Sequence, residues 1–474
     1  MQGSGEDRLP RDIMIIALLT TTSASFLTPF ISSATNIALP KIGFEFALDT
    51  VMLGWVQTSF LLTTGIFLVP FGKAADILGR KRVFVTGLVV YTLASLFASI
   101  ANSAVILITF RIFQGIGGAM LAATSVAILS SVFPPRERGK VLGINVASVY
   151  TSIALGPFLG GILTEHFGWR SVFLVNVPVG LITLLLTLRL RQEWRGSPGE
   201  KFDFLGSTLY GLSLAAIMWG TLSISSYWAG LYSPPAYALA IGLSLMISFV
   251  VWEMRIKNPV LDLRLFVHNR TFSLSNISAL INYGATYALS FLLSLYLQVV
   301  KGMPPQLAGT VLVAQPVVQA LLSPVAGWLS DKVSPGVVAS IGIALNSLGL
   351  LILSTIDVST EISSIIFMLV LMGIGFALFS SPNTNAVMSS IGREQFGVAS
   401  AILSTMRTLG QTFSIAVATL VLSLFIGSEV LSPSDLGDFI TGMHSAFLIF
   451  AFMCAVGVFT SIYREAPRKP PNFS

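Results

Sequence analysis

One short charged motif occurs twice in this chain, as GKAADILGRKR from Gly72 to Arg82 and as GWLSDK from Gly327 to Lys332. In each copy an aspartate follows a glycine by four residues, and a proline, Pro70 or Pro324, precedes the glycine. A tight turn explains the glycine, and an acceptor for exposed helix-end N–H groups explains the aspartate. Because both copies follow long apolar runs, the motif predicts two related halves repeated along the chain.

Outward from both copies the sequence is strongly apolar. Of its 474 residues, 54% are hydrophobic and only 10% are charged, against about 25% in soluble domains, which excludes a water-soluble protein. Apolar runs of at least ~18 residues predict membrane-spanning helices, and the length accommodates fourteen of them. We expect them at 13–39, 51–71, 83–101, 105–133, 141–164, 171–190, 204–225, 236–254, 273–299, 307–329, 337–356, 363–389, 397–427 and 440–463. One cysteine and three histidines argue against a disulfide framework and a metal site.

Basic residues are distributed unequally between the two sides of these spans. The side with the termini carries 22 of the 27 lysines and arginines, while the opposite loops carry only Lys41, Arg170 and Lys301. The remaining two, Arg111 and Arg407, lie inside spans. By the positive-inside rule, both termini are cytoplasmic and the chain crosses the cell membrane. The net charge of +6 is therefore an orientation signal, and no nucleic-acid partner is expected.

The repeat divides the chain into two bundles of six spans with an inserted pair between them. A linker containing Gly196, Ser197, Pro198 and Gly199 suits the passage from the first bundle to the insert. We expect a tail at 1–12, the first bundle at 13–190, a linker at 191–203, the inserted pair at 204–254, a linker at 255–272, the second bundle at 273–463 and a tail at 464–474.

Three further motifs accompany the repeat: RIFQGIGG from Arg111 to Gly118, GPFLGG from Gly156 to Gly161, and WRSVFLVNVPVG from Trp169 to Gly180. With residues 72 to 82, they resemble the major facilitator superfamily, in its fourteen-helix drug:proton antiporter branch. The resemblance implies alternating access, multidrug efflux and proton coupling, with no cofactor and no chemical conversion of the substrate.

The resemblance also implies roles for two groups of residues. It suggests a cytoplasmic latch formed by Gly72, Asp76, Gly79, Arg80, Arg82 and Asp331, and an antiporter motif formed by Ser152, Gly156, Pro157, Gly160 and Gly161. Read from the residues alone, the first group is turn chemistry with topology anchors, and the second lets helices approach closely and bend. Both interpretations stay open.

Two positions depart from the pattern of this branch. An aspartate usually precedes the asparagine of span 1 by five residues, but here that position is Ile31. The antiporter motif usually begins with glycine, where this chain has Ser152. The first departure removes the usual protonatable acid, and the second weakens the expectation of strict exchange.

Polar residues recur at helical spacing within several spans, such as Ser400, Ser404, Arg407, Gln411 and Ser414. Lipid cannot satisfy such stripes, so they predict a central, partly wet cavity between the bundles, although single serines also serve as helix–helix contacts. The substrate cavity is expected to contain Ser32, Asn36, Gln57, Arg111, Gln114, Tyr150, Tyr283, Tyr287, Gln315, Gln319, Asn383, Arg407 and Gln411.

Two arginines within spans are the clearest indication of a polar site inside the membrane. Burying a cation there costs at least ~2.5 to 3.5 kcal/mol, and no acidic residue lies near the middle of any predicted span. Arg111 and Arg407 should therefore bond to groups such as Gln114 or Gln411, to water, or to an anionic substrate group. This pattern favours neutral or anionic amphiphiles over lipophilic dications.

The sequence thus predicts an all-helical, fourteen-span secondary transporter for small amphipathic molecules, with membrane lipids and, by resemblance, protons as partners, acting as a monomer. An alternative is a lipid or anionic amphiphile translocator without proton antiport. A membrane-embedded enzyme is not expected, because the chain has no Gly-x-Ser-x-Gly elbow and no histidine cluster.

Overall fold

A computed structural model describes residues 10–196, 199–227, 233–392, 396–427 and 435–464. Within these ranges, fourteen helical segments are long and apolar enough to cross a membrane, and there is no β-strand. This confirms the predicted fold class. Ser197 and Pro198 of the expected first linker, and most of both expected tails, lie outside the described residues.

Eleven of these spans are single helices and three are interrupted, within the described part of the chain. The first bundle comprises α1 (Arg11–Phe46), α2 (Thr50–Leu78), α3 (Arg80–Ser99), α4 (Ala104–Val132), α5 (Pro135–His166), and α6 (Arg170–Leu174) followed by α7 (Asn176–Leu188). The inserted pair is α8 (Phe204–Tyr227) and α9 (Pro234–Arg255), and the short α10 (Arg264–His268) follows it. The second bundle comprises α11 (Arg270–Thr286) with α12 (Ala288–Leu295) and the π-helix η1 (Tyr296–Val300), α13 (Pro305–Leu312) with α14 (Ala314–Lys332), α15 (Pro335–Leu353), α16 (Ile362–Ser389), α17 (Phe396–Ile426) and α18 (Leu436–Ile462).

Proline explains two of the three interruptions. Proline has no N–H and its ring clashes with the carbonyl four residues earlier. Accordingly, α6 ends at Leu174, four residues before Pro178, and α13 ends at Leu312, four residues before Pro316. The break between α11 and α12 has no such proline; there the N–H of Ala288 donates to Oγ of Ser414 on α17, at 2.9 Å. A side chain from a distant helix therefore takes part in this break.

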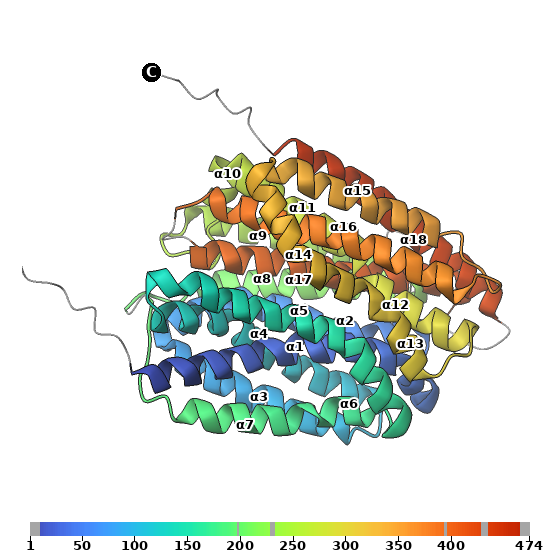
Figure 1. The fold of residues 1–474 in the computed structure, drawn as a ribbon, viewed down its shortest axis with the longest axis horizontal. Coiled ribbons are helices and arrows are strands. Elements are labelled where there is room, and N and C mark those ends of the chain that lie inside the picture. The colour runs from blue at the N-terminus through green and yellow to red at the C-terminus, as the bar shows by residue number, and fades with distance from the viewer. Residues whose placement is uncertain (1–9, 197–198, 228–232, 393–395, 428–434, 465–474) are drawn as a thin grey trace, which may run out of the picture.

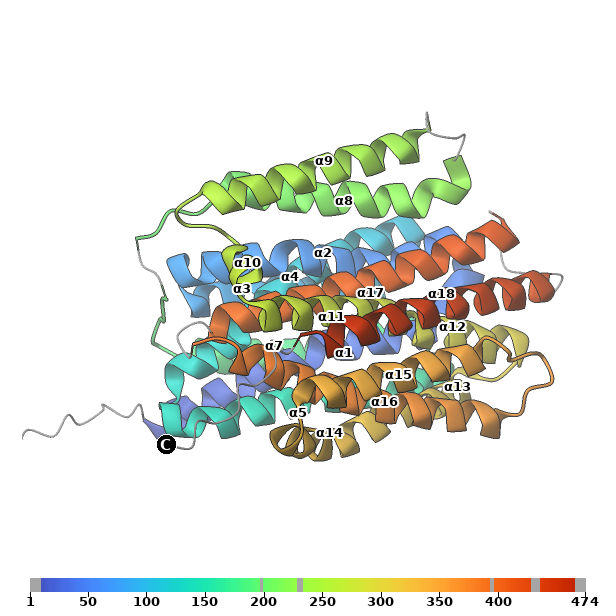
Figure 2. The ribbon, with the colours of Figure 1, turned by 90° about the horizontal axis from the view of Figure 1, so that it is seen from above.

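The two bundles repeat one packing pattern, and the inserted pair lies beside them. Helices α2 and α3 both pack on α4, as α14 and α15 both pack on α16. Figure 2 shows α8 and α9 together at one edge of the molecule. Helix α8 contacts α2 of the first bundle and α17 of the second. The Tyr210 hydroxyl donates to the Gly65 carbonyl at 3.2 Å, which fastens the insert to α2.

The bundles converge toward one end. We call the end where α1 begins and α18 finishes the terminal side, and the other end the opposite side. Helices α5 and α13, and α1 and α12, join the bundles in the half nearer the opposite side. Figure 1 shows the ribbons of the two bundles diverging toward the terminal side, on the left of the view. The fold is therefore closed at the opposite side.

Backbone contacts close this end. A Cβ atom added to Gly161 would lie 2.6 Å from the Pro305 carbonyl oxygen, and one added to Gly309 would lie 2.1 Å from the Pro157 carbonyl oxygen. Side chains add to the contact, since Oε2 of Glu165 accepts from the Gln306 N–H at 2.9 Å. The predicted antiporter motif thus packs α5 against α13 across the bundle interface.

Gly161→Ala should open the opposite side. The added methyl group would meet backbone atoms that cannot rotate away, and such overpacking costs about 1 to 3 kcal/mol. Spin labels can be attached at Phe167→Cys and Val358→Cys in a Cys454→Ala background. Double electron–electron resonance should then show a population with a longer distance between the two labels. Gly143→Ala is the matched control, because nothing lies within 4 Å of that Cβ position on the same helix. An unchanged distance distribution in Gly161→Ala would contradict the closing role.

Candidate functional site

Arg111 on α4 is fully buried and held by neutral groups. Its Nε donates to the Val56 carbonyl at 3.0 Å, Nη1 to Oε1 of Gln114 at 2.8 Å, and Nη2 to Oε1 of Gln57 at 3.2 Å. The guanidinium carbon also lies 4.5 Å from the Phe60 ring centroid, a cation–π contact. No carboxylate among the described residues contacts this guanidinium. Arg111 is thus stabilised by oriented amide, carbonyl and aromatic groups.

The Arg111 cluster continues into the second bundle. Nε2 of Gln57 donates to the Ser32 hydroxyl at 3.0 Å and to the Tyr287 hydroxyl at 3.3 Å, and the two hydroxyls lie 2.6 Å apart. Ser32 and Gln57 belong to α1 and α2, whereas Tyr287 sits at the break between α11 and α12. The break therefore places a second-bundle phenol in contact with the first bundle. Five predicted site residues, Ser32, Gln57, Arg111, Gln114 and Tyr287, form one network.

Arg407 on α17 forms a second cluster and is less completely satisfied. Its Nη2 donates to Oγ1 of Thr384 at 2.8 Å, and its guanidinium carbon lies 5.6 Å from the Tyr283 ring centroid. The side chain is only partly buried, and its Nε has no hydrogen-bond partner. Tyr150 of the first bundle reaches this region, with its hydroxyl 2.5 Å from Oγ of Ser380. The buried Nε of Arg407 therefore lacks an acceptor, whereas each guanidinium nitrogen of Arg111 has one.

The other predicted cavity residues lie apart from these clusters. Gln411 does not bond to Arg407, contrary to one expectation; it is half-buried, as is Gln315. Gln319 is buried on α14, and Asn36 is buried with its Oδ1 lacking a partner. The structure therefore supports a smaller polar site than the stripes indicated.

Asn383, which we expected in the cavity, bonds to a third group of residues. Its Oδ1 accepts from Nη1 of Arg464 at 2.7 Å, and its Nδ2 donates to the Ser275 carbonyl at 3.1 Å. Arg464, which we expected at the start of the tail, is fully buried and also donates to the Pro335 carbonyl. Like Arg111, this arginine is fully buried, and it fastens the terminal ends of α11, α15 and α16. Its position one residue beyond an apolar span gave no signal of burial.

The predicted latch residues make their contacts inside each bundle. Arg80 pairs with Asp76, with Nη2 2.7 Å from Oδ1, and its Nη1 donates to the Ala127 carbonyl at 3.0 Å. Glu193 of the first linker accepts from the N–H of Lys81 at 2.8 Å. Gly79, between α2 and α3, has φ of 125°, which favours glycine. Gly72 and Arg82 lie in the same region, the latter 3.8 Å from Oε2 of Glu193.

The second copy of the motif repeats this arrangement in part. Oδ1 of Asp331, at the end of α14, accepts from Nδ2 of Asn385 on α16 at 3.2 Å. Equivalent helices are therefore joined by polar contacts in both halves, α2 to α4 through Arg80 and α14 to α16 through Asp331. Among the residues that the structure describes, none of these contacts crosses between the bundles.

The two departures from the family pattern are both buried. Ile31 is fully buried and contributes to the apolar core of α1. Ser152 is fully buried, and its hydroxyl donates to the Val149 carbonyl of its own helix at 2.7 Å. On the same helix, Gly156 and Gly160 face α1, where added Cβ atoms would lie within 3 Å of Ser33 and Ala34. These residues pack the first bundle.

A buried carboxyl pair lies at the terminal side of the inserted helices, and the sequence analysis did not single it out as a site. A Cβ atom added to Gly206 would lie 2.2 Å from Oδ2 of Asp203 and 2.5 Å from Oε1 of Glu253, so the carboxyl groups converge. Asp203 is 6% exposed and Glu253 1% exposed. Trp252 Nε1 and the Gly206 N–H donate to Asp203, and the N–H groups of Val260 and Leu261 donate to Glu253.

Comparison with known proteins places this architecture in a family. The sequence model described as Major Facilitator Superfamily matches residues 21–261 and 276–474. A crystal structure of a bacterial homologue of the human lysosomal transporter Spinster, described as inward-facing and unoccupied, aligns with a TM-score of 0.70, covering 96% of this chain and 98% of that chain at 16% identity.

Curated relatives match along nearly the whole chain. The riboflavin transporter RibZ of Clostridioides difficile is 29% identical, with 94% of this chain and 97% of RibZ covered. The multidrug resistance protein Stp of Mycobacterium tuberculosis is 31% identical, covering 88% and 78%. The cephamycin export protein CmcT of Amycolatopsis lactamdurans is 33% identical, covering 96% and 93%.

The two cavity arginines should differ in their effect on stability. Arg111→Met leaves Oε1 of Gln114 and Oε1 of Gln57 without a donor, at about 1 to 3 kcal/mol for each, so we expect a loss of at least about 2 kcal/mol in the free energy of unfolding. Arg407→Met removes one hydrogen bond from a partly exposed group and should cost about 1 kcal/mol. Thermal unfolding of the purified variants in detergent measures both. Equal losses would show that the difference in burial has no energetic meaning.

Proposed function

This chain belongs to the Major Facilitator Superfamily, and we propose that within it the protein exports small neutral or anionic amphipathic molecules by alternating access. As a member, it is a multi-pass membrane transporter and not an enzyme. Two of the relatives are named for multidrug resistance and cephamycin export, and a third for riboflavin transport. These names support small organic molecules as the substrate class.

The distribution of basic residues supports an assignment of the two sides of the protein to the two sides of the membrane. The excess of lysine and arginine on the terminal side supports a cytoplasmic location for that side. The contacts between the bundles lie toward the opposite side, which supports assigning the described conformation to an inward-facing state. In this state the Arg407 cluster would receive a molecule from the cytoplasm, as an exporter requires.

Arg407 is the observation that carries the substrate class. Its side chain is half-buried as a whole, its buried Nε has no hydrogen-bond partner, and its guanidinium lies over the Tyr283 ring with Tyr150 close by. An anionic or carbonyl oxygen would supply the missing acceptor, and the two aromatic rings would contact an apolar body. A cationic ligand would meet the positive charge of Arg407, and the position that usually bears a carboxylate is Ile31.

Arg407→Gln should reduce transport selectively. In liposomes carrying the purified protein, we expect export of an anionic dye to fall at least about tenfold, because a charge-assisted hydrogen bond is lost, while a neutral dye of similar size changes little. Lys140→Gln is the control, since it removes one exposed positive charge from the terminal side. Transport of a cationic dye that equals or exceeds that of the anion in the unaltered protein would refute the substrate class.

For proton coupling we propose the Asp203 and Glu253 pair. Two buried carboxyl groups this close, with no basic partner among the described residues, favour a state that holds one proton between them. The pair sits on the helix pair that contacts α2 and α17, one helix from each bundle. Gain or loss of that proton would alter the packing of the inserted helix pair, and α8 of this pair contacts both bundles.

Glu253→Gln should uncouple protons from substrate. Glutamine keeps an acceptor for one of the two N–H groups of Val260 and Leu261 but cannot release a proton, so substrate export should proceed with substrate-driven acidification or alkalinisation of the liposome lumen reduced by at least about tenfold. An internal pH dye measures this. Asp262→Asn, in the neighbouring linker, is the matched control. Unchanged proton movement in Asp203→Asn/Glu253→Gln would remove the pair from the mechanism.

The second candidate is facilitated movement of lipids or anionic amphiphiles without proton antiport. It is favoured by the absence of any carboxylate contacting Arg111 or Arg407 in the described part of the chain. In the same liposome assay, equal transport with and without a pH gradient would select this candidate.

A further inference from the structure

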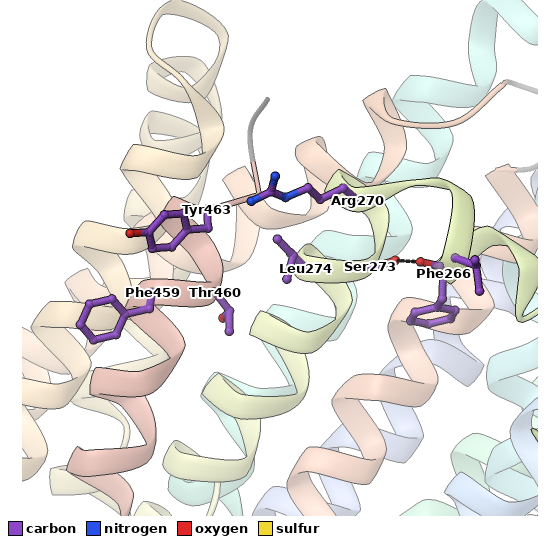
Figure 3. A pocket seen from close by; sticks show the side chains of 8 residues that line it. Phe266, Arg270, Ser273, Leu274, Phe459, Thr460 and Tyr463 are labelled. Carbon is purple, nitrogen blue, oxygen red and sulfur yellow. Dashed lines mark hydrogen bonds between the residues drawn. The ribbon is translucent and has the colours of Figure 1, made fainter. Parts of the chain in front are cut away.

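An open groove lies on the outer surface of the second bundle, away from the bundle interface. It has a volume of about 510 Å³ and is lined by Phe266, Val267, Arg270, Ser273, Leu274, Phe459, Thr460 and Tyr463. These residues come from α10, α11 and α18, which all belong to the terminal half of one bundle. Figure 3 shows Arg270 extending from the start of α11 toward Tyr463 of α18, across the mouth of the groove. The groove is therefore distinct from the Arg407 cluster.

Local contacts hold the walls of the groove in place. Oγ of Ser273 donates to the Phe266 carbonyl, which fastens α10 to α11. The hydroxyls of Ser278 and Thr460 lie 2.9 Å apart, which joins α11 to α18 at the closed end of the groove. The space between the helices is thus a formed feature of the surface.

The groove combines one free cation with an apolar floor. Arg270 is exposed and makes no hydrogen bond or ion pair with any residue that the structure describes. Below it, Phe452, Val456, Phe459 and Tyr463 recur at helical spacing on α18, with 72%, 42%, 62% and 62% of their surfaces exposed. An apolar stripe of this kind is stable in contact with hydrocarbon, whereas a free guanidinium at its end requires an anion.

We infer that this groove binds an anionic phospholipid. The phosphate would lie against Arg270 at the N-terminal end of α11, where the helix dipole also favours negative charge. One acyl chain would run along Leu274 and the α18 stripe toward the middle of the membrane. Tyr463, with an apolar ring and a polar hydroxyl, suits the boundary between headgroup and hydrocarbon.

The charge and the location of the groove favour an anionic phospholipid over a transported substrate. No residue of the first bundle lines the groove, so a molecule bound there would lie outside the interface between the bundles. Lipid binding at this groove goes beyond the proposed export function. Its test measures binding and not transport, so failure of this inference and failure of the export function would give different results.

Native mass spectrometry of the full chain in mild detergent tests the inference, with phosphatidylglycerol and phosphatidylcholine of matched chain length as probes. We expect the unaltered protein to bind phosphatidylglycerol preferentially at its tightest site. Arg270→Gln should weaken phosphatidylglycerol binding about fivefold, the effect of one basic residue near an anionic surface, and leave phosphatidylcholine unchanged. Arg270→Lys should retain most of the preference.

Two further variants separate the groove from general surface effects. Leu274→Trp fills the apolar floor and should weaken binding of both lipids, while Lys140→Gln, which removes an exposed charge on the other bundle, should behave like the unaltered protein. Equal binding of the two lipids by the unaltered protein, an undiminished preference in Arg270→Gln, an equal loss in Lys140→Gln, or no effect of Leu274→Trp would each overturn the inference. Unchanged thermal unfolding of the variants confirms that they are folded.

Discussion

The structure depends on one constraint: a polar group within the hydrocarbon layer must find its partners inside the protein. Arg111 shows how the constraint is met without an opposite charge. Three acceptors from α2 and α4 surround its guanidinium, and one of them, Gln57, passes the network on to Tyr287 in the other bundle. Because the arginine needs these acceptors, it fixes the relative positions of helices that have few other polar contacts.

The difference in bonding between Arg111 and Arg407 suits a structural role for Arg111 and a binding role for Arg407. Each guanidinium nitrogen of Arg111 has a hydrogen-bond partner, whereas the buried Nε of Arg407 has none and would gain from an acceptor. Arg407 thus combines a charge, an aromatic neighbour and partial exposure at one place. Arg464 differs from both by its position, because it is fully buried and bonded at the terminal ends of three helices.

Much of the fold could be predicted from the sequence, and less of the site. Fourteen spans follow from apolar length alone, and the Arg111–Gln114 bond follows from helical spacing, because residues three apart share a face. The contact of Gln57 with Tyr287 depends on a helix break that has no proline near it, so local sequence gave no indication of it. The Asp203–Glu253 and Asn383–Arg464 contacts join residues about 50 and 81 positions apart, and only tertiary packing brings them together.

The closure between α5 and α13 has an entropic consequence. Gly161 and Gly309 meet main-chain atoms of Pro305 and Pro157, so the core of this contact contains almost no rotatable side chain. When such surfaces part, few rotamers are released, and when they rejoin, few must be frozen. Opening and closing at this end therefore exchanges mainly dispersion energy, whose sum grows with the area in contact.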